Sequence, residues 1–223
     1  MPVNPTMVPA MQLALDANFG SVEQWRDDFT TRARHLVGTG GSVRLVFQPS
    51  DGRLVNQTLR AAAADGADGA DNADGVALLT LEVHANQALD WPAWSAHTDW
   101  AAPYAAYQHA VHAASAALGG SALDVAGAVL VDVRRAGMFA QAQHMLPGAQ
   151  WRDPALVALW ALLLPKDRPV LVYCIYGHEV GRVTALRLHA AGVQARFLQG
   201  GIDEWSSAGR PLQAITNQIA DTP

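Results

Sequence analysis

Residues 170–192, VLVYCIYGHEVGRVTALRLHAAG, join an apolar run of strand length to a helical pattern. Cys174, the only cysteine among the 223 residues, lies where the two patterns meet. A short apolar run bounded by a turn is typical of a buried parallel strand, and the pattern after it predicts a helix from about Val180. The stretch therefore predicts a strand, a loop at 175–179 and a helix, with the thiol at the junction.

The second half of the chain alternates between two kinds of segment. Apolar runs of strand length lie at 126–133, 169–174 and 195–201, and helical patterns lie at 153–165 and 180–192. Alternation of this kind predicts βαβ units and a parallel sheet with helices on both faces. We therefore expect an α/β domain that binds ligands beyond the carboxyl ends of its strands, where Cys174 lies.

The first half has the pattern of an α+β domain with a small antiparallel sheet. Ser21 caps a predicted helix that Gly38 closes, and one face of this helix repeats every four residues. The residues of that face are Trp25, Phe29, Ala33 and Val37. Three β-type runs follow, at 42–48, 53–59 and 76–84. The Ala-, Asp- and Gly-rich stretch 61–76 predicts a long mobile surface loop.

The connection between the halves is rich in Ala, Trp, Tyr and His. It predicts a helix within 101–120 that Gly119 and Gly120 stop. We place two domains at 1–105 and 106–223. Five aromatic residues are expected to join the first domain to the second or to another subunit, because large rings favour such contacts. They are Trp91, Trp94, Trp100, Tyr104 and Tyr107.

Composition and charge argue against several classes of partner. The net charge is −5 and no Lys/Arg cluster is present, which disfavours nucleic acid and anionic membranes. No apolar run approaches the length of a membrane-spanning helix, and the N-terminus lacks a signal-peptide pattern. A single cysteine cannot form an intrachain disulfide, so we expect a cytoplasmic protein. A homodimer is compatible with these features.

Cys174 is the candidate nucleophile. The N–H groups of the following loop and of a helix N-terminus form an anion site, which favours a thiolate over a thiol. Gly177 permits the backbone conformation that turns these N–H groups inward. The residues expected to bind the substrate are Ile175, Tyr176, Gly177, His178, Glu179, Val180 and, one turn into the helix, Arg182.

Four motifs over about residues 122–215 resemble those of the rhodanese sulfurtransferase superfamily. They are LVDVRR (130–135), HMLPGAQ (144–150), VLVYCIYGHE (170–179) and LQGGIDEWSSAGRPL (198–212). The resemblance implies a rhodanese-like fold and a cysteine that takes sulfane sulfur from a small-molecule donor. The cysteine would carry this sulfur as a persulfide to a thiol or cyanide acceptor, without a metal or cofactor. The resemblance also implies that Asp132 and Arg134 support the site.

One position departs from that pattern. Where many active family members carry a basic or hydroxyl residue, this loop has Glu179, whose carboxylate would repel an anionic donor. A catalytically weak binding or thiol-redox sensing module is therefore the alternative. The related dual-specificity phosphatases have a loop one residue longer that ends in Arg. The loop from Cys174 to Glu179 has the shorter form, which disfavours a phosphatase.

Residues 18–55 resemble the C-terminal domain of iron/manganese superoxide dismutases, and the resemblance extends over about residues 11–100. In that family the third strand ends in Asp-x-Trp-Glu-His, which supplies two metal ligands. The corresponding positions here are Glu82, His84, Ala85 and Asn86. One ligand has become Glu and the other has become Asn, so the resemblance implies a retained scaffold without its metal. A working metal-dependent dismutase is the disfavoured third interpretation.

Overall fold

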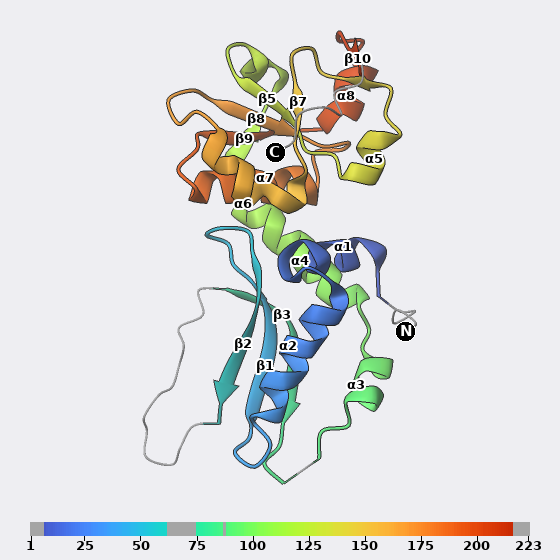
Figure 1. Ribbon diagram of the computed structural model, residues 1–223, viewed down its shortest axis with the longest axis vertical. Helices are drawn as coiled ribbons and strands as arrows, with labels where there is room; N and C mark the ends of the chain where they lie inside the picture. The colour runs from blue at the N-terminus through green and yellow to red at the C-terminus, as the bar shows by residue number, and fades with distance from the viewer. Residues whose placement is uncertain (1–6, 62–74, 87, 216–223) are drawn as a thin grey trace. The chain divides into compact units, whose positions relative to one another are not determined.

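The computed structural model describes residues 7–61, 75–86 and 88–215 (Figure 1). The chain divides into two units, and the division falls inside helix α4 (Ala101–Ala114). One unit comprises Met1–Pro49 with Arg53–Ala110, and the other comprises Ser50–Gly52 with Val111–Pro223. Almost all of the stretch predicted as a mobile loop, 61–76, lies outside the described residues. Among the described helices, none is both long and apolar enough to cross a bilayer.

The first unit combines helices with a three-stranded antiparallel sheet. Its strands pair in the order β2-β1-β3, and both pairings are antiparallel. This confirms the small antiparallel sheet that the sequence predicted. In chain order the elements before α4 are α1 (Pro9–Phe19), α2 (Val22–Arg34), β1 (Gly41–Phe47), β2 (Leu54–Arg60), β3 (Val76–Val83) and α3 (Trp91–His97).

Helix α2 begins as predicted but ends earlier. Oγ of Ser21 accepts a hydrogen bond of 3.1 Å from a backbone N–H of the first turn and so caps the helix. The helix ends at Arg34, so the prediction that Gly38 closes it is wrong. Because the helical repeat stops there, Leu36 is buried at 1% exposure, whereas Val37, expected on the buried face, is 46% exposed.

Aromatic rings pack together inside the first unit. The ring pairs with centroids no more than 6.0 Å apart are Trp25–Phe29, Trp25–Trp100, Phe29–Trp91, Phe29–Trp94, Trp91–Trp94 and Phe47–Tyr107. Four of the five aromatic residues expected to join this unit to another domain or subunit therefore pack on its own rings. These rings meet because the residues after β3 fold back onto α2 and β1, and a contact with another domain or subunit stays a prediction.

A polar cluster joins α2 to β2 beside these rings. Nε1 of Trp25 donates to Oδ1 of Asn56 at 3.0 Å, and Nδ2 of Asn56 donates to Oδ2 of Asp28 at 2.8 Å. The same Asp28 oxygen accepts a hydrogen bond of 2.8 Å from Nε of Arg32. Partial burial alone would raise the pKa of Asp28, but the hydrogen bonds from Arg32 and Asn56 and the charge of Arg32 hold it below its usual 3.8.

The Asp28 cluster predicts a pH-dependent contribution to stability. Because the pKa is lower in the folded state than in the unfolded chain, the contribution is present above the usual pKa and is lost as the pH falls through the lowered one. Urea unfolding should therefore find Asp28→Asn less stable than wild type near neutral pH, with a difference that shrinks below pH 3.8. A difference that is the same at both pH values would contradict this assignment.

The second unit is built on a five-stranded sheet in the order β4-β9-β8-β5-β7. All four pairings are parallel, which confirms the predicted architecture. The strands are β4 (Gly119–Gly120), β5 (Val129–Asp132), β7 (Gln150–Trp151), β8 (Val170–Tyr173) and β9 (Ala195–Leu198). A separate antiparallel pair joins β6 (His144–Met145) to β10 (Gln213–Ala214).

The two glycines predicted to stop a helix form the edge strand β4 instead. The α-helix ends at Ala114, and a short 3-10 turn, η1 (Ala116–Leu118), leads into the strand. A Cβ atom on Gly120 would approach Cδ1 of Leu171 to 2.9 Å, so a residue without a side chain lets this strand lie close to the sheet.

Helices cover both faces of this sheet (Figure 1). Val170, Val172 and Cys174 pack in the cluster that includes α6 and α7, whereas Leu171 and Tyr173 pack in the cluster that includes α8. This alternation is the two-residue period of a strand, and it directs the Cys174 side chain toward α7. The other elements are η2 (Ala122–Val125), α5 (Ala136–Ala140), α7 (Glu179–Ala190) and α8 (Gly201–Ser207).

The helix predicted over 153–165 is broken into three short pieces. They are η3 (Pro154–Leu156), α6 (Val157–Trp160) and η4 (Ala161–Leu163). Nε1 of Trp160 donates to the carbonyl of Asp153 at 2.8 Å, which holds the segment in single turns. Only part of its apolar surface is buried, and Leu159 and Leu162 are exposed.

Candidate functional site

Cys174 follows β8 directly and is only 6% exposed. Its side chain belongs to a core cluster that includes Val172 and Phe197. A Cβ atom placed on Gly181, in the first turn of α7, would lie 3.4 Å from Sγ of Cys174. The sulfur therefore faces the N-terminal turn of α7, where the helix dipole favours a negative charge.

Two hydrogen bonds from α8 orient the loop that follows Cys174. The N–H of Ile202 donates to the carbonyl of Cys174, and the N–H of Asp203 donates to the carbonyl of Ile175, both at 3.0 Å. The peptide bonds are trans, so the N–H groups of Ile175 and Tyr176 point away from α8. Among the residues that the structure describes, the N–H groups of 175–178 have no hydrogen-bond acceptor. The loop thus presents free donors on the side opposite α8.

Two glycines allow the loop and α8 to approach this closely. Gly177 and Gly201 have φ angles of +69° and +60°, which side chains rarely permit. A Cβ atom on Gly177 would lie 2.7 Å from the carbonyl oxygen of Leu198. One on Gly201 would lie 2.3 Å from the carbonyl oxygen of Ile175. A side chain at either position would displace the backbone of the loop or of its neighbour.

Arg182 is held against the loop by three contacts. Nε donates to the carbonyl of Gly177 at 3.0 Å, and Nη1 donates to Oγ of Ser115 at 3.2 Å. Cζ lies 4.3 Å from the centroid of the Phe197 ring, a cation–π contact. Burial lowers the pKa of Arg182, while the negative charges of Glu179 and of a Cys174 thiolate oppose that shift. Arg182 was predicted from the sequence as a site residue, whereas Ser115 was not.

The remaining residues of the loop that follows Cys174 differ in their exposure. Tyr176 is 55% exposed, and its ring lies 5.8 Å from that of exposed His178. Ile175 and Val180 are partly buried. Glu179 is the first residue of α7, one position before the predicted start, where a carboxylate is favoured by the helix dipole. The assignment of these residues to substrate binding stays a prediction.

Asp132 and Arg134 form a buried ion pair at the end of β5. Nε of Arg134 lies 3.0 and 2.9 Å from the two carboxylate oxygens of Asp132, and Nη2 donates to the same carboxylate. The hydroxyl of Tyr173 donates to Asp132 at 3.0 Å and accepts from the N–H of Leu146 at 3.1 Å. Burial and the charge of Asp132 raise the pKa of Tyr173. This network ties β5 to the residue before Cys174, and no sequence pattern indicated a role for Tyr173.

Cys174 thus lies at the carboxyl end of a strand in a parallel α/β unit, directly before a loop whose N–H groups have no acceptor among the described residues. The rhodanese-like domain family matches residues 112–208. A sulfurtransferase of Allochromatium vinosum is 31% identical over 91 residues, which cover 41% of this chain and 83% of that protein. The chain belongs to the rhodanese-like family through this region.

Solved structures with a similar fold include a full-length protein of Lactobacillus plantarum, 22% identical with a TM-score of 0.42. The match covers 45% of this chain and 90% of that one. A rhodanese-related protein of Thermoplasma volcanium is 17% identical with a TM-score of 0.38, covering 43% of this chain and 96% of that one.

The chain is also similar to part of an iron superoxide dismutase of Cupriavidus metallidurans, with 38% identity over 98 residues. The match covers 44% of this chain and 43% of that protein, so the chain spans less than half of the dismutase. Glu82, on β3, and His84, just after it, are exposed. No group of three or more His, Cys, Asp or Glu side chains in the described part of the chain could hold a metal. These residues do not fit the metal of a dismutase.

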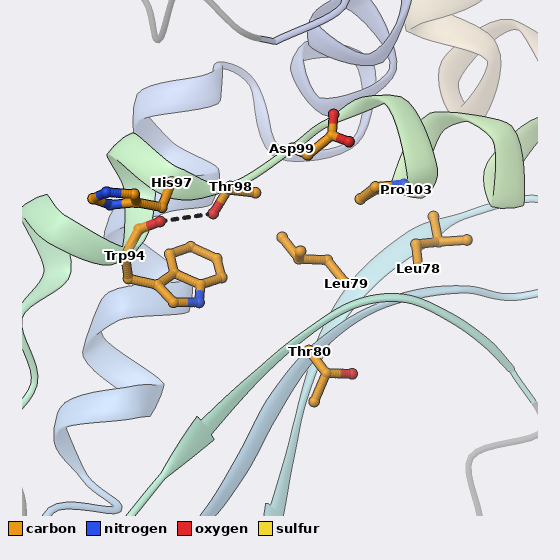
Figure 2. Close-up of a pocket in the computed structure, with 8 residues that line it drawn as sticks. All are labelled: Leu78, Leu79, Thr80, Trp94, His97, Thr98, Asp99 and Pro103. Carbon is orange, nitrogen blue, oxygen red and sulfur yellow. Dashed lines mark hydrogen bonds between the residues drawn. The ribbon is translucent and has the colours of Figure 1, made fainter.

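A pocket of about 390 Å³ lies within the first unit, between β3 and the α3–α4 region (Figure 2). It is lined by Leu78, Leu79, Thr80, Trp94, His97, Thr98, Asp99 and Pro103. The Thr98 hydroxyl donates to the carbonyl of Trp94 at 2.9 Å, which fixes the turn after α3. None of the residues predicted to bind or transfer sulfur lines this pocket.

The close contact between Gly201 and the loop predicts an unequal effect of two alanine substitutions. Gly209 also has a positive φ, +67°, but nothing lies within 4 Å of an added Cβ atom. Gly209→Ala should therefore cost only the backbone strain of about 1–2 kcal/mol. Gly201→Ala adds a clash with two loop carbonyls, and should cost about 1–3 kcal/mol more in urea unfolding. Equal losses would show that α8 does not support the loop.

Proposed function

We propose that this protein is a sulfurtransferase that carries sulfane sulfur as a persulfide on Cys174. The observation that carries this proposal is the set of N–H groups at 175–178, which find no acceptor in the described residues, beside a thiol at the N-terminus of α7. Membership of the rhodanese-like family supports it. Thiosulfate and cyanide serve here as the test donor and acceptor.

The proposed reaction is a pair of displacements at sulfur. The Cys174 thiolate attacks the outer sulfur of thiosulfate, a new S–S bond forms, and the donor S–S bond breaks as sulfite leaves with the electron pair. Cyanide then attacks the outer sulfur of the persulfide, and thiocyanate leaves as the Cys174 thiolate is restored. A thiol acceptor is converted to its persulfide in the same way. The exchange needs no external oxidant or reductant.

The loop provides the place for the transferred atom. An S–S bond is about 2 Å long, so the outer sulfur extends beyond the buried Sγ toward the loop. That sulfur is negatively charged, and the N–H groups of Ile175 and Tyr176 would stabilise it as hydrogen-bond donors. Residues 175–180 would hold the donor during transfer. Asp132 and Arg134 would support the site indirectly. Their ion pair holds the hydroxyl of Tyr173, and Tyr173 is the last residue of β8 before Cys174.

We further propose domains at 1–105 and 106–223, the first being a dismutase-like scaffold without its metal. The single cysteine fits a cytoplasmic location, since no intrachain disulfide can form. The proposed partners are a small-molecule sulfur donor and a thiol or cyanide acceptor, and a homodimer is compatible with the fold.

Loss of the thiol should abolish the activity and leave the fold intact. After incubation with thiosulfate, the intact mass of wild type should rise by one sulfur atom, and added cyanide should remove it as thiocyanate. Cys174→Ser, which has nearly the same shape, should show neither change while its circular dichroism stays the same. Sulfur uptake by the serine variant would sink the proposal. Uptake by wild type without release to cyanide would favour the sensing module.

A further inference from the structure

Ser115 presents a fixed hydrogen-bond acceptor inside the second unit. It is completely buried and directly follows α4. Its hydroxyl donates to the carbonyl of Val111 at 2.7 Å, so its proton is engaged by the helix. The lone pairs of Oγ remain for Nη1 of Arg182, which lies 3.2 Å away. The serine therefore defines where one arm of the guanidinium can lie.

The other arm of Arg182 orients the far end of the loop. Nε donates to the carbonyl of Gly177, and in a trans peptide this turns the N–H of His178 away from the guanidinium. At the near end, α8 orients the carbonyls of Cys174 and Ile175 by the same means. Protein donors thus bind three carbonyls of this short loop, and within the described part of the chain its N–H groups have no acceptor.

The contacts of Arg182 leave it poorly placed to bind a donor. Nε is engaged by Gly177 and Nη1 by Ser115, and one face lies on the Phe197 ring. A donor anion that bound the same arms of the guanidinium would have to break the hydrogen bonds that shape the loop. The planar fork of arginine, with donors at fixed angles, suits the simultaneous contact to two acceptors.

We therefore infer, on the basis of the proposed function, that Arg182 and Ser115 are positioning residues for the Cys174 loop and that Arg182 does not bind the sulfur donor. Arg182, on α7, holds the loop through the carbonyl of Gly177, and α8 holds it through the carbonyls of Cys174 and Ile175. This changes the role that the sequence suggested for Arg182 from substrate contact to loop support.

Ser115→Ala separates the two roles because it keeps the Arg182 charge and removes only its anchor. A positioning role predicts a kcat for thiosulfate:cyanide transfer reduced about tenfold, as the loss of one charged hydrogen bond can produce, with KM for thiosulfate nearly unchanged. Arg182→Gln should lower kcat about 100-fold, the scale of a misplaced reacting group. Arg182→Lys should not rescue it, because one ammonium cannot replace the fork.

Two matched variants control for burial and charge. Thr184→Val removes another buried hydroxyl, one that bonds to Val180 within α7, and Arg196→Gln removes a surface partner of Asp124. Both should retain wild-type kcat. An Arg182→Gln variant with raised KM and unchanged kcat, full rescue by Lys, or wild-type kcat in Ser115→Ala would each overturn the inference.

A second measurement separates this inference from the sulfurtransferase proposal. Alkylation of Cys174 by neutral iodoacetamide requires no sulfur transfer, so it reports on the loop even if thiocyanate is never formed. Ser115→Ala and Arg182→Gln should change its rate from that of wild type, while Thr184→Val and Arg196→Gln should not. Unchanged rates in the first two variants would refute the positioning role, whatever the fate of the transfer activity.

Discussion

The hydrogen bonds from the first N–H groups of α8 to the carbonyls of Cys174 and Ile175 are the constraint on which the site depends. Those N–H groups are free because the first turn of a helix gives them no internal acceptor. Gly200 and Gly201, with φ angles of +68° and +60°, turn the chain so that α8 begins against the loop. Since a peptide is planar and trans, binding each carbonyl directs the next N–H to the opposite side.

The buried sulfur and the free N–H groups fit together once two elements are considered jointly. The two-residue period of β8 directs the Cys174 side chain toward α7, which shields Sγ from solvent. The loop that follows Cys174 supplies the N–H donors. Arg182 contributes positive charge near the sulfur while its arms shape the loop. In the first unit, aromatic rings pack around Trp25, and no group of three or more His, Cys, Asp or Glu side chains among the described residues could hold a metal.

The parallel sheet could be predicted because buried parallel strands appear in a sequence as short, continuous apolar runs. The position of Cys174 followed from the end of one such run. Prediction failed where tertiary contacts decide the outcome. Gly119 and Gly120 indicate a helix stop by their backbone freedom, but their pairing with β9 depends on strand order. Ser115 had no signal, because its partner Arg182 is 67 residues away and only the fold brings them together. Trp91 and Trp94 were expected at an interface because large rings favour such contacts. Ring size alone, however, does not specify which surface a ring packs against.

In the proposed mechanism, the loop N–H groups receive the sulfur that Cys174 carries. A crystal structure of the protein after reaction with a sulfane donor tests it most directly. We expect one added atom bonded to Sγ of Cys174, within hydrogen-bond distance of the N–H groups of Ile175 and Tyr176. Added sulfur that points away from the loop, or loop carbonyls turned toward it, would refute the proposed role of these N–H groups.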